Sequence, residues 1–257
     1  MTRSLIGSGI VAGRILRELA RTRRTLLFWT LFPTLMLLLF GSVYASKFGG
    51  MDVSFTITSP GILIGAAMFF SCLAGPLTVI VGERERHTIR RLLISPLSGT
   101  AYFLGVLWAH VIIAFGQAAI IYAITLSVGG RFNGSLWLGS MVIVLGVAAY
   151  AGIGVMFGTF FAKRTEDATG PVAAVGVTLL VLGGTFFSID NLTPFLLRLA
   201  QFDPIFHMNH AMRAIWIDGA SLSELSRTIL LLALMALISL FLGAVSYRAM
   251  LRKEQLS

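Results

Sequence analysis

The chain has 257 residues, of which 56% are hydrophobic and only 12% are charged, and its mean hydropathy is +0.88. Soluble domains carry about 25% charged residues, so this composition excludes an ordinary soluble protein and predicts one embedded in lipid. The net charge of +9 at pH 7 follows the membrane topology derived below and does not indicate nucleic-acid binding.

Residues 1–24 form a basic segment that precedes the first long apolar run. From residue 11 onward, helical spacing places four arginines on one arc and four apolar residues on the opposite side: Arg14, Arg17, Arg21 and Arg24, and Ala12, Ile15, Leu16 and Leu19. This pattern predicts an amphipathic helix in the inner membrane interface, with its basic face toward anionic head groups. A docking surface for a cytoplasmic partner explains the pattern equally well, and the two interpretations are compatible.

Six runs without charged residues follow along the chain: residues 25–46, 53–82, 92–130, 132–162, 168–189 and 228–247. Each supplies the roughly 20 apolar residues that cross a hydrocarbon core of about 30 Å. Open strand edges would leave backbone groups without partners in lipid, so the runs predict six transmembrane helices. Residues 25–257 are therefore expected to form one all-α integral membrane domain.

The distribution of basic residues predicts how this domain is oriented. Of the 20 Lys and Arg residues, 15 fall in the segments that share a side with the two termini, whereas the acidic residues divide six to five. The positive-inside rule therefore places both termini in the cytoplasm. The single cysteine, Cys72, lies inside the second run, which excludes an intramolecular disulfide.

Two glycine pairs with helical spacing occur in the apolar runs. They are Gly61 and Gly65 in the second run and Gly154 and Gly158 in the fourth. Such pairs allow helices to approach closely in lipid, and we expect packing within the bundle rather than a dimer seam.

Residues 83–98, after the second run, combine dense charge with an apolar stripe. The ionisable side chains are Glu83, Arg84, Glu85, Arg86, His87, Arg90 and Arg91, and the stripe is Ile89, Leu92, Leu93 and Leu97. Acidic residues at the start and basic residues at the end suit the dipole of a short helix. A solvated loop helix would explain the charges but not the stripe. We therefore predict a segment that presses against another protein at the membrane surface.

The connection 190–220 is too apolar for a solvated loop. Thr193-Pro194 and Asp203-Pro204 each look like a helix N-cap followed by proline at the first helical position. We therefore predict two short helices that dip back into the outer leaflet. Ser221 and Glu224 then form a capping box that opens the last span.

No catalytic arrangement stands out in the sequence. Asp203, His207 and His210 share a helix face and could hold a metal, but capping and ordinary interfacial histidines explain them better, so we expect no metal site. The only lysines are Lys47, Lys163 and Lys253, and none lies in a P-loop setting. The chain is therefore not expected to be an enzyme or to bind ATP through a P-loop.

Two motifs resemble those of the permeases of ABC-2 type exporters. The first is Glu83-Arg84-Glu85-Arg86-x-Thr88-Ile89-x-Arg91-Leu92-Leu93-x-Ser95-Pro96-Leu97-Ser98. The second is Asn191-Leu192-x-Pro194-Phe195-Leu196, followed by Asp203-Pro204 and Ala211-Met212-Arg213. In span count, loop order and both motifs, the resemblance covers essentially the whole chain. The family includes daunorubicin-type and nodulation-factor exporters. His87 stands where the family commonly has glycine, and Val106 where a lysine is common, which leaves the subfamily open.

The resemblance implies the membrane subunit of an ABC exporter in the bacterial inner membrane. It would pair with a second copy or a related permease, contact membrane lipids, and carry no cofactor of its own. Residues 83–98 would be a coupling helix that docks on a separate cytoplasmic ATPase, which binds ATP and Mg. The implied coupling residues are Glu83, Arg84, Glu85, Arg86, Thr88, Arg90 and Arg91.

In this family the route would be lined mainly by the first, second and fifth spans. Those spans are apolar and aromatic here, which favours an amphiphilic or lipid-like cargo, with Phe32, Phe69, Ser71 and Phe186 as candidate lining residues. An ion-coupled secondary transporter is the alternative, but it usually places ionisable groups at mid-membrane, and the six runs hold no Asp, Glu, Lys or Arg. A purely structural membrane protein would leave residues 83–98 unexplained.

Overall fold

The computed structural model describes residues 2–86, 88, 97–160, 165–186, 189 and 192–256, and these residues are mostly helical, with no strand among them. The helices before the 83–98 segment are α1 (Thr2–Arg21), α2 (Arg23–Val43), α3 (Ala45–Phe48), α4 (Met51–Gly61), the π-helix η1 (Ile62–Leu73) and α5 (Ala74–Glu85). Those after it are α7 (Gly99–Ser127), α8 (Leu136–Phe160), α9 (Thr165–Leu182), α10 (Pro194–Ala200), α11 (Pro204–Arg213), the π-helix η3 (Ala214–Asp218) and α12 (Leu222–Leu256). The prediction of an all-α membrane protein is confirmed.

Five helices in the described part of the chain are long and apolar enough to cross a membrane. They are α2, the continuous helix Met51–Glu85, α7, α8, and Leu222–Lys253 within α12. The fifth predicted span, residues 168–189, overlaps α9, which is helical over 18 described residues but is not among these five helices. Glu166 and Asp167 lie in its first turn, and residues 161–164 before it lie outside the described residues. The count of six spans stays a prediction.

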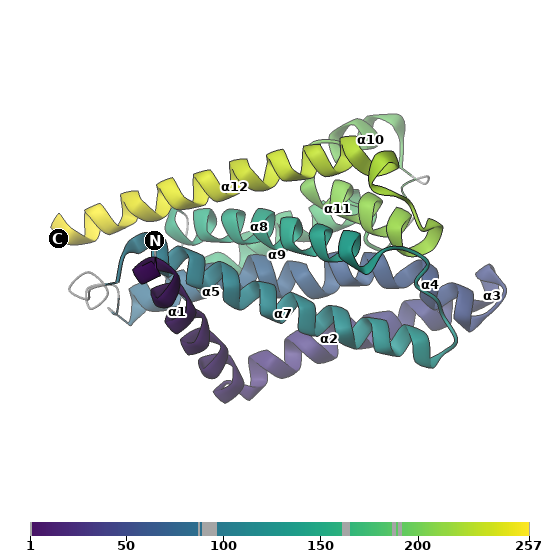
Figure 1. The fold of residues 1–257 in the computed structure, drawn as a ribbon, viewed down its shortest axis with the longest axis horizontal. Coiled ribbons are helices and arrows are strands. Elements are labelled where there is room, and N and C mark those ends of the chain that lie inside the picture. Colours follow the sequence, from purple (N-terminus) through teal and green to yellow (C-terminus); the bar gives the residue numbers. More distant parts are fainter. Residues whose placement is uncertain are drawn as a thin grey trace.

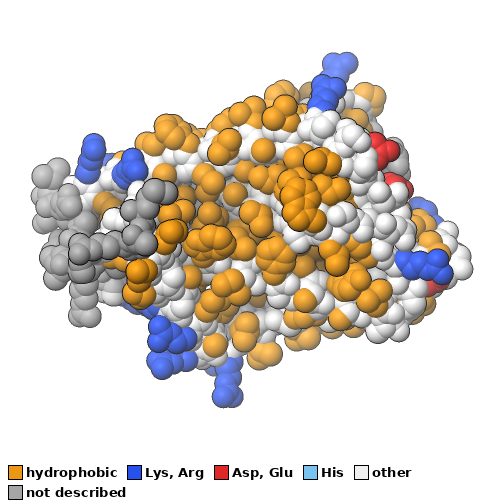
Figure 2. Space-filling view, in the orientation of Figure 1, with side chains coloured by type: hydrophobic (Ala, Val, Ile, Leu, Met, Phe, Trp, Pro, Cys, Tyr) orange, Lys and Arg blue, Asp and Glu red, His pale blue; other side chains and the backbone are white. Residues whose placement is uncertain are grey.

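The long helices lie side by side along the length of the molecule, with α1 crossing them at one end (Figure 1). The N- and C-termini both lie at that end, which we call the terminal end. Helices α3, α10 and α11 lie at the opposite end. Hydrophobic side chains cover the middle of the face shown in Figure 2, and Lys and Arg side chains stand toward its two ends. This distribution is typical of a protein that crosses a membrane.

The helix η1 lies at the centre of the core. Its residues are buried apart from the half-buried Phe70, and it contacts α2, α7 and α8. Two glycines of α8 permit this packing, since a Cβ at Gly154 or Gly158 would press on the backbone carbonyl oxygens of Leu73 and Leu77. The expectation that this glycine pair serves packing within the bundle is confirmed, as small residues let helix backbones approach closely.

The N-terminal helix differs from the prediction at both ends. It begins at Thr2 and ends at Arg21, so Arg24 belongs to α2. The apolar side of α1 packs on the protein itself: Val11, Ala12 and Ile15 are buried and share a cluster with side chains of α7. The described apolar face of α1 is therefore anchored on the bundle, while Arg17 and Arg21 are exposed.

Candidate functional site

The start of the charged 83–98 segment is the last turn of a long helix. The prediction that a helix begins at residue 83 is wrong, because α5 continues to Glu85 and the N–H of Arg86 still bonds to the carbonyl oxygen of Gly82. Glu83 therefore lies near a helix C-terminus, where the helix dipole disfavours a carboxylate. A positively charged side chain close to Glu83 has to offset this cost.

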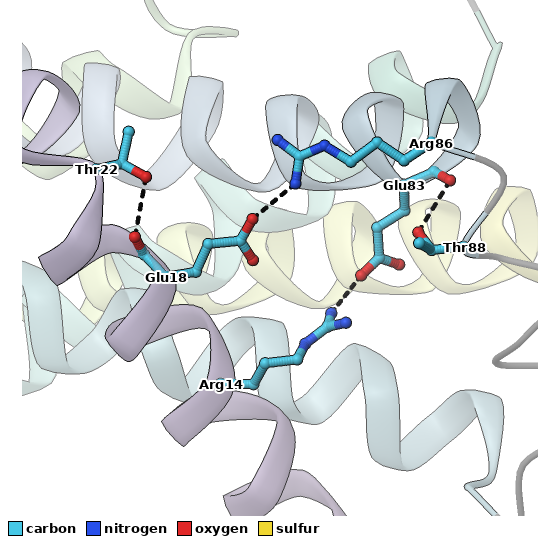
Figure 3. Close-up of polar contacts among 6 residues, drawn as sticks. All are labelled: Arg14, Glu18, Thr22, Glu83, Arg86 and Thr88. Carbon is cyan, nitrogen blue, oxygen red and sulfur yellow. Dashed lines mark hydrogen bonds and ion pairs between the residues drawn. The ribbon is translucent and has the colours of Figure 1, made fainter.

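That positive group is Arg14 of α1. Its Nη2 donates to Oε1 of Glu83 in an ion pair between residues 69 positions apart (Figure 3). The Glu83 side chain is 11% exposed and that of Arg14 is 42% exposed. Removing one partner of a buried pair leaves an uncompensated charge, so Glu83 depends on Arg14 more than Arg14 depends on Glu83.

A second ion pair runs beside the first. Arg86 Nη1 donates to Glu18 Oε1 at 2.8 Å, and these side chains are 70% and 52% exposed (Figure 3). Exposed pairs of this kind contribute about 0.2–1 kcal/mol. Because Arg14 and Glu18 are one helical turn apart, the two pairs hold one face of α1 against the end of α5.

Two further bonds secure this end of α5. Thr88 Oγ1 donates to the carbonyl oxygen of Glu83 at 3.1 Å, and Arg84 Nη1 donates to the carbonyl oxygen of Thr159 in α8 at 3.5 Å. The described beginning of the 83–98 segment therefore contacts both α1 and α8.

The structure brings part of the predicted coupling set together. Glu83, Arg84, Glu85, Arg86 and Thr88 gather at the terminal end, whereas His87, Arg90 and Arg91 lie outside the described residues. Of the predicted basic face, Arg14 takes part in the site. Arg17, Arg21 and Arg24 are exposed.

Sequence reasoning missed Glu18 as a partner and missed the role of Arg14 as the counter-charge of Glu83. The sequence did hold a signal for these pairs. Arg14 and Glu18 are spaced to lie on one helix face, with the positive residue first, and Glu83 and Arg86 are spaced in the same way with the negative residue first.

The candidate lining residues do not form one surface. Phe69 and Ser71 are buried inside the bundle. Ser71 Oγ donates to Oε1 of Gln117 at 2.8 Å, and Gln117 Nε2 donates to the carbonyl oxygen of Trp29 at 2.8 Å. These bonds tie η1, α7 and α2 together across the core.

The other two candidates are half-buried and lie in separate aromatic groups. Phe32 stands against Phe28 and Phe70, with ring centroids 5.4 and 5.1 Å away, and Phe186 stacks on Phe40 at 5.3 Å. Their role in a route stays a prediction.

The predicted caps at the opposite end are confirmed. Thr193 Oγ1 accepts from the N–H of Leu196 at 3.4 Å, and Asp203 Oδ1 accepts from the N–H of Ile205 at 2.9 Å. Ser221 and Glu224 form the expected capping box, since Glu224 Oε2 accepts from both the N–H and the hydroxyl of Ser221 at 2.7 Å.

Asp203 is the buried acid of this end. Burial raises its pKa to about 7, although the hydrogen bond from Ile205 opposes the shift. His207 Nε2 lies 2.8 Å from the carbonyl oxygen of Gln201. Within the described residues, no three His, Cys, Asp or Glu side chains come together as a metal site.

Comparison with known proteins supports the motifs seen in the sequence. Residues 9–217 match the family "ABC-2 type transporter". One relative is named "Probable multidrug ABC transporter permease YbhR", from Escherichia coli K12, and is 28% identical over 144 residues, which are 56% of this chain. That match spans 39% of the length of YbhR. Another is "Inner membrane transport permease YadH" of the same strain, 25% identical over 185 residues and 70% of each chain.

The family match covers most of the chain and includes the charged segment and the part of α1 that carries Arg14 and Glu18. The apolar helices described above agree with it. The chain therefore belongs to the ABC-2 type transporter family and is a multi-pass membrane protein.

Proposed function

We propose that the chain is the permease subunit of an ATP-driven exporter in the bacterial inner membrane, with a separate cytoplasmic ATPase as its energy source. The observation that carries the proposal is the pair of ion pairs that join α1 to the end of α5, where the coupling motif begins. The family match and the names of its relatives support a transport role.

The contacts of the site suggest how work would enter the membrane domain. An ATPase that pushes on residues 83–98 would displace the end of α5, which continues without a break into the buried η1. Through Glu83 and Arg86 the same push would reach α1, whose apolar face is packed on α7. One movement at the terminal end would therefore reach two of the membrane-spanning helices, Met51–Glu85 and α7, since packed helices move as rigid elements.

The contacts to the ATPase would come from the charged motif, including its part outside the described residues. This set is Glu83, Arg84, Glu85, Arg86, Thr88, Arg90 and Arg91, with Arg17 and Arg21 of α1 beside it. The terminal end would face the cytoplasm, in keeping with the excess of basic residues there.

The cargo we propose is amphiphilic or lipid-like and moves outward. Partly exposed aromatic side chains on α2, among them Phe28 and Phe32, support this class. The working unit would be a dimer with a second copy or a related permease, with α9 as the fifth of six spans and α10 and α11 re-entering the outer leaflet.

Isolation of the tagged chain from its native membrane tests this proposal. We expect a soluble ATPase to co-purify, and its ATP hydrolysis in vesicles to be stimulated by the permease. Arg86→Ala is expected to weaken that stimulation without loss of membrane insertion. Arg198→Ala is the matched control, because Arg198 is an exposed arginine of α10, at the end opposite the charged motif.

Two results would contradict the proposal. One is export by the purified chain on an ion gradient alone, with no ATPase present, as expected for a secondary transporter. The other is an Arg86→Ala variant that stimulates ATP hydrolysis and exports as the unchanged protein does.

A further inference from the structure

A polar cavity of about 300 Å³ lies at the terminal end between α1, α2, α5 and α7. The two ion pairs of Figure 3 form part of its wall. Ten of the 15 residues that line the cavity have polar or charged side chains. Its lining includes Arg14, Glu18, Trp29, Glu83, Arg86 and His110.

His110 presents an unused acceptor to this region. Its side chain is fully buried, and its Nδ1 lies 2.7 Å from the carbonyl oxygen of Val106, so Nδ1 carries the proton and Nε2 the lone pair. Within the described part of the chain, Nε2 has no hydrogen-bond partner. A Cβ at Gly75 would lie 2.6 Å from it, so glycine there leaves space beside the acceptor.

Arg14 presents the complementary donor. Its Nη2 is used by Glu83, but its buried Nε has no partner among the described residues. Unsatisfied buried donors and acceptors cost free energy, so one donor and one acceptor in the wall of one cavity indicate a ligand that carries both kinds of group.

The charges of the described lining favour a zwitterion. Two arginines, Arg14 and Arg86, face the cavity with three glutamates, Glu18, Glu83 and Glu85. A purely anionic head group would meet the carboxylates and a purely cationic one the guanidinium groups. A head group with an ammonium beside a phosphate satisfies both, because Arg suits phosphate and the carboxylates suit an ammonium.

The neighbouring surface of α2 suits acyl chains. Leu26, Leu27, Phe28 and Leu31 are exposed at the start of this helix, directly after Thr25 and next to Trp29, both of which line the cavity. Tryptophan commonly lies at the level of lipid head groups, with its ring between polar and apolar regions. The cavity and this surface together match an amphiphile with its head inside and its chains on α2.

We propose that this cavity binds the phosphoethanolamine-type head group of a membrane lipid from the adjoining leaflet. The ammonium donates an N–H to His110 Nε2 and lies near the carboxylates, and the phosphate accepts from Arg14 Nε. The site belongs to the permease alone and does not depend on the ATPase.

Native mass spectrometry of the detergent-solubilised permease tests the proposal. The probes are phosphatidylethanolamine, phosphatidylcholine and phosphatidylglycerol with identical acyl chains. We expect phosphatidylethanolamine to bind roughly tenfold more tightly than either, as one charge-assisted hydrogen bond requires. Phosphatidylcholine has no N–H on its ammonium, and phosphatidylglycerol has no ammonium. Equal affinity for the three lipids would overturn the proposal, and this comparison needs no variant.

A variant locates the site. His110→Phe keeps a ring but removes the acceptor, and it should lower the affinity for phosphatidylethanolamine roughly tenfold, to that of the other two lipids. His210→Phe makes the same change at an exposed residue of α11 and should leave the affinity unchanged. A His110→Phe protein that retains full selectivity would overturn the proposal.

A competition experiment distinguishes a membrane lipid from a soluble phosphoethanolamine compound as the ligand. Glycerophosphoethanolamine has the head group without acyl chains. If it competes with the lipid only weakly, the ligand is a lipid held by its chains on α2; competition at equal concentration would assign the site to a soluble phosphoethanolamine. Loss of ATPase stimulation in the earlier experiment would not alter any of these results.

Discussion

The two ends of the molecule are stabilised in different ways. At the terminal end, Arg14 pairs with Glu83 and Glu18 with Arg86, so charged partners come from positions 69 and 68 apart in the chain. At the opposite end, the helix starts are capped by side chains two or three positions away, at Thr193 and Asp203. Because the long-range pairs join α1 to the end of α5, a displacement of one helix is passed to the other. Each local cap stabilises the start of its own helix, whatever the other helices do.

The largest expected effect is at Glu83. Glu83→Ala removes the partner of Arg14 and with it one of the two ion pairs that hold α1 at the end of α5, which should lower the free energy of unfolding by about 2 kcal/mol. Glu83→Gln should cost less, because the amide oxygen still accepts from Arg14. Equilibrium unfolding in mixed detergent micelles measures both. Equal stability of the alanine variant and the unchanged protein would show that the pair contributes little.

A pH dependence is expected from the opposite end. Burial raises the pKa of Asp203 from 3.8 to about 7, so between these values the folded protein holds a proton that the unfolded chain has lost. The free energy of unfolding should therefore fall as pH rises from about 4 to about 7.

Asp203→Asn tests that dependence, because asparagine keeps the N-cap acceptor and cannot ionise. Its unfolding free energy should vary less over the same pH range than that of the unchanged protein. An identical pH profile for the two proteins would assign the dependence to another group.

A smaller effect is expected at Thr193. Thr193→Ala removes the cap of α10 and should lower the free energy of unfolding by about 0.5–1 kcal/mol, with Thr193→Ser as the control that retains the hydroxyl. A local cap between neutral groups should be insensitive to salt, whereas the exposed Glu18–Arg86 pair should weaken at high salt. Salt titration of Thr193→Ala and Arg86→Ala compares the two ends directly.

These contrasts explain how much of the structure the sequence could predict. The caps at Thr193, Asp203 and Ser221 follow from short patterns, because each depends on neighbours a few positions away. The apolar runs predicted the spanning helices for the same reason, since hydropathy is local. Five such helices are found among the described residues, whereas α9, which overlaps the fifth predicted span, has 18 residues and holds Glu166 and Asp167 in its first turn.

The sequence was less informative wherever a residue distant in the chain determines a helix boundary or the partner of a side chain. The start of a separate helix at residue 83 was predicted wrongly, because Arg14 allows α5 to keep a carboxylate near its C-terminus. Ser71 lay among candidate route residues, yet it bonds to Gln117 inside the core. Neither pairing has a local pattern, as each joins segments that only the packed bundle brings together.

The central claim is that the charged motif is joined to α1 through Arg14 and Glu83, and that this junction carries the work of an ATPase. The most direct test exchanges the two charges, measuring stimulated ATP hydrolysis for Arg14→Glu, for Glu83→Arg and for both changes together. We predict that each single variant loses stimulation and that the double variant recovers much of it, because the pair is restored in reverse. A double variant as impaired as the single ones, or single variants with full stimulation, would contradict the account.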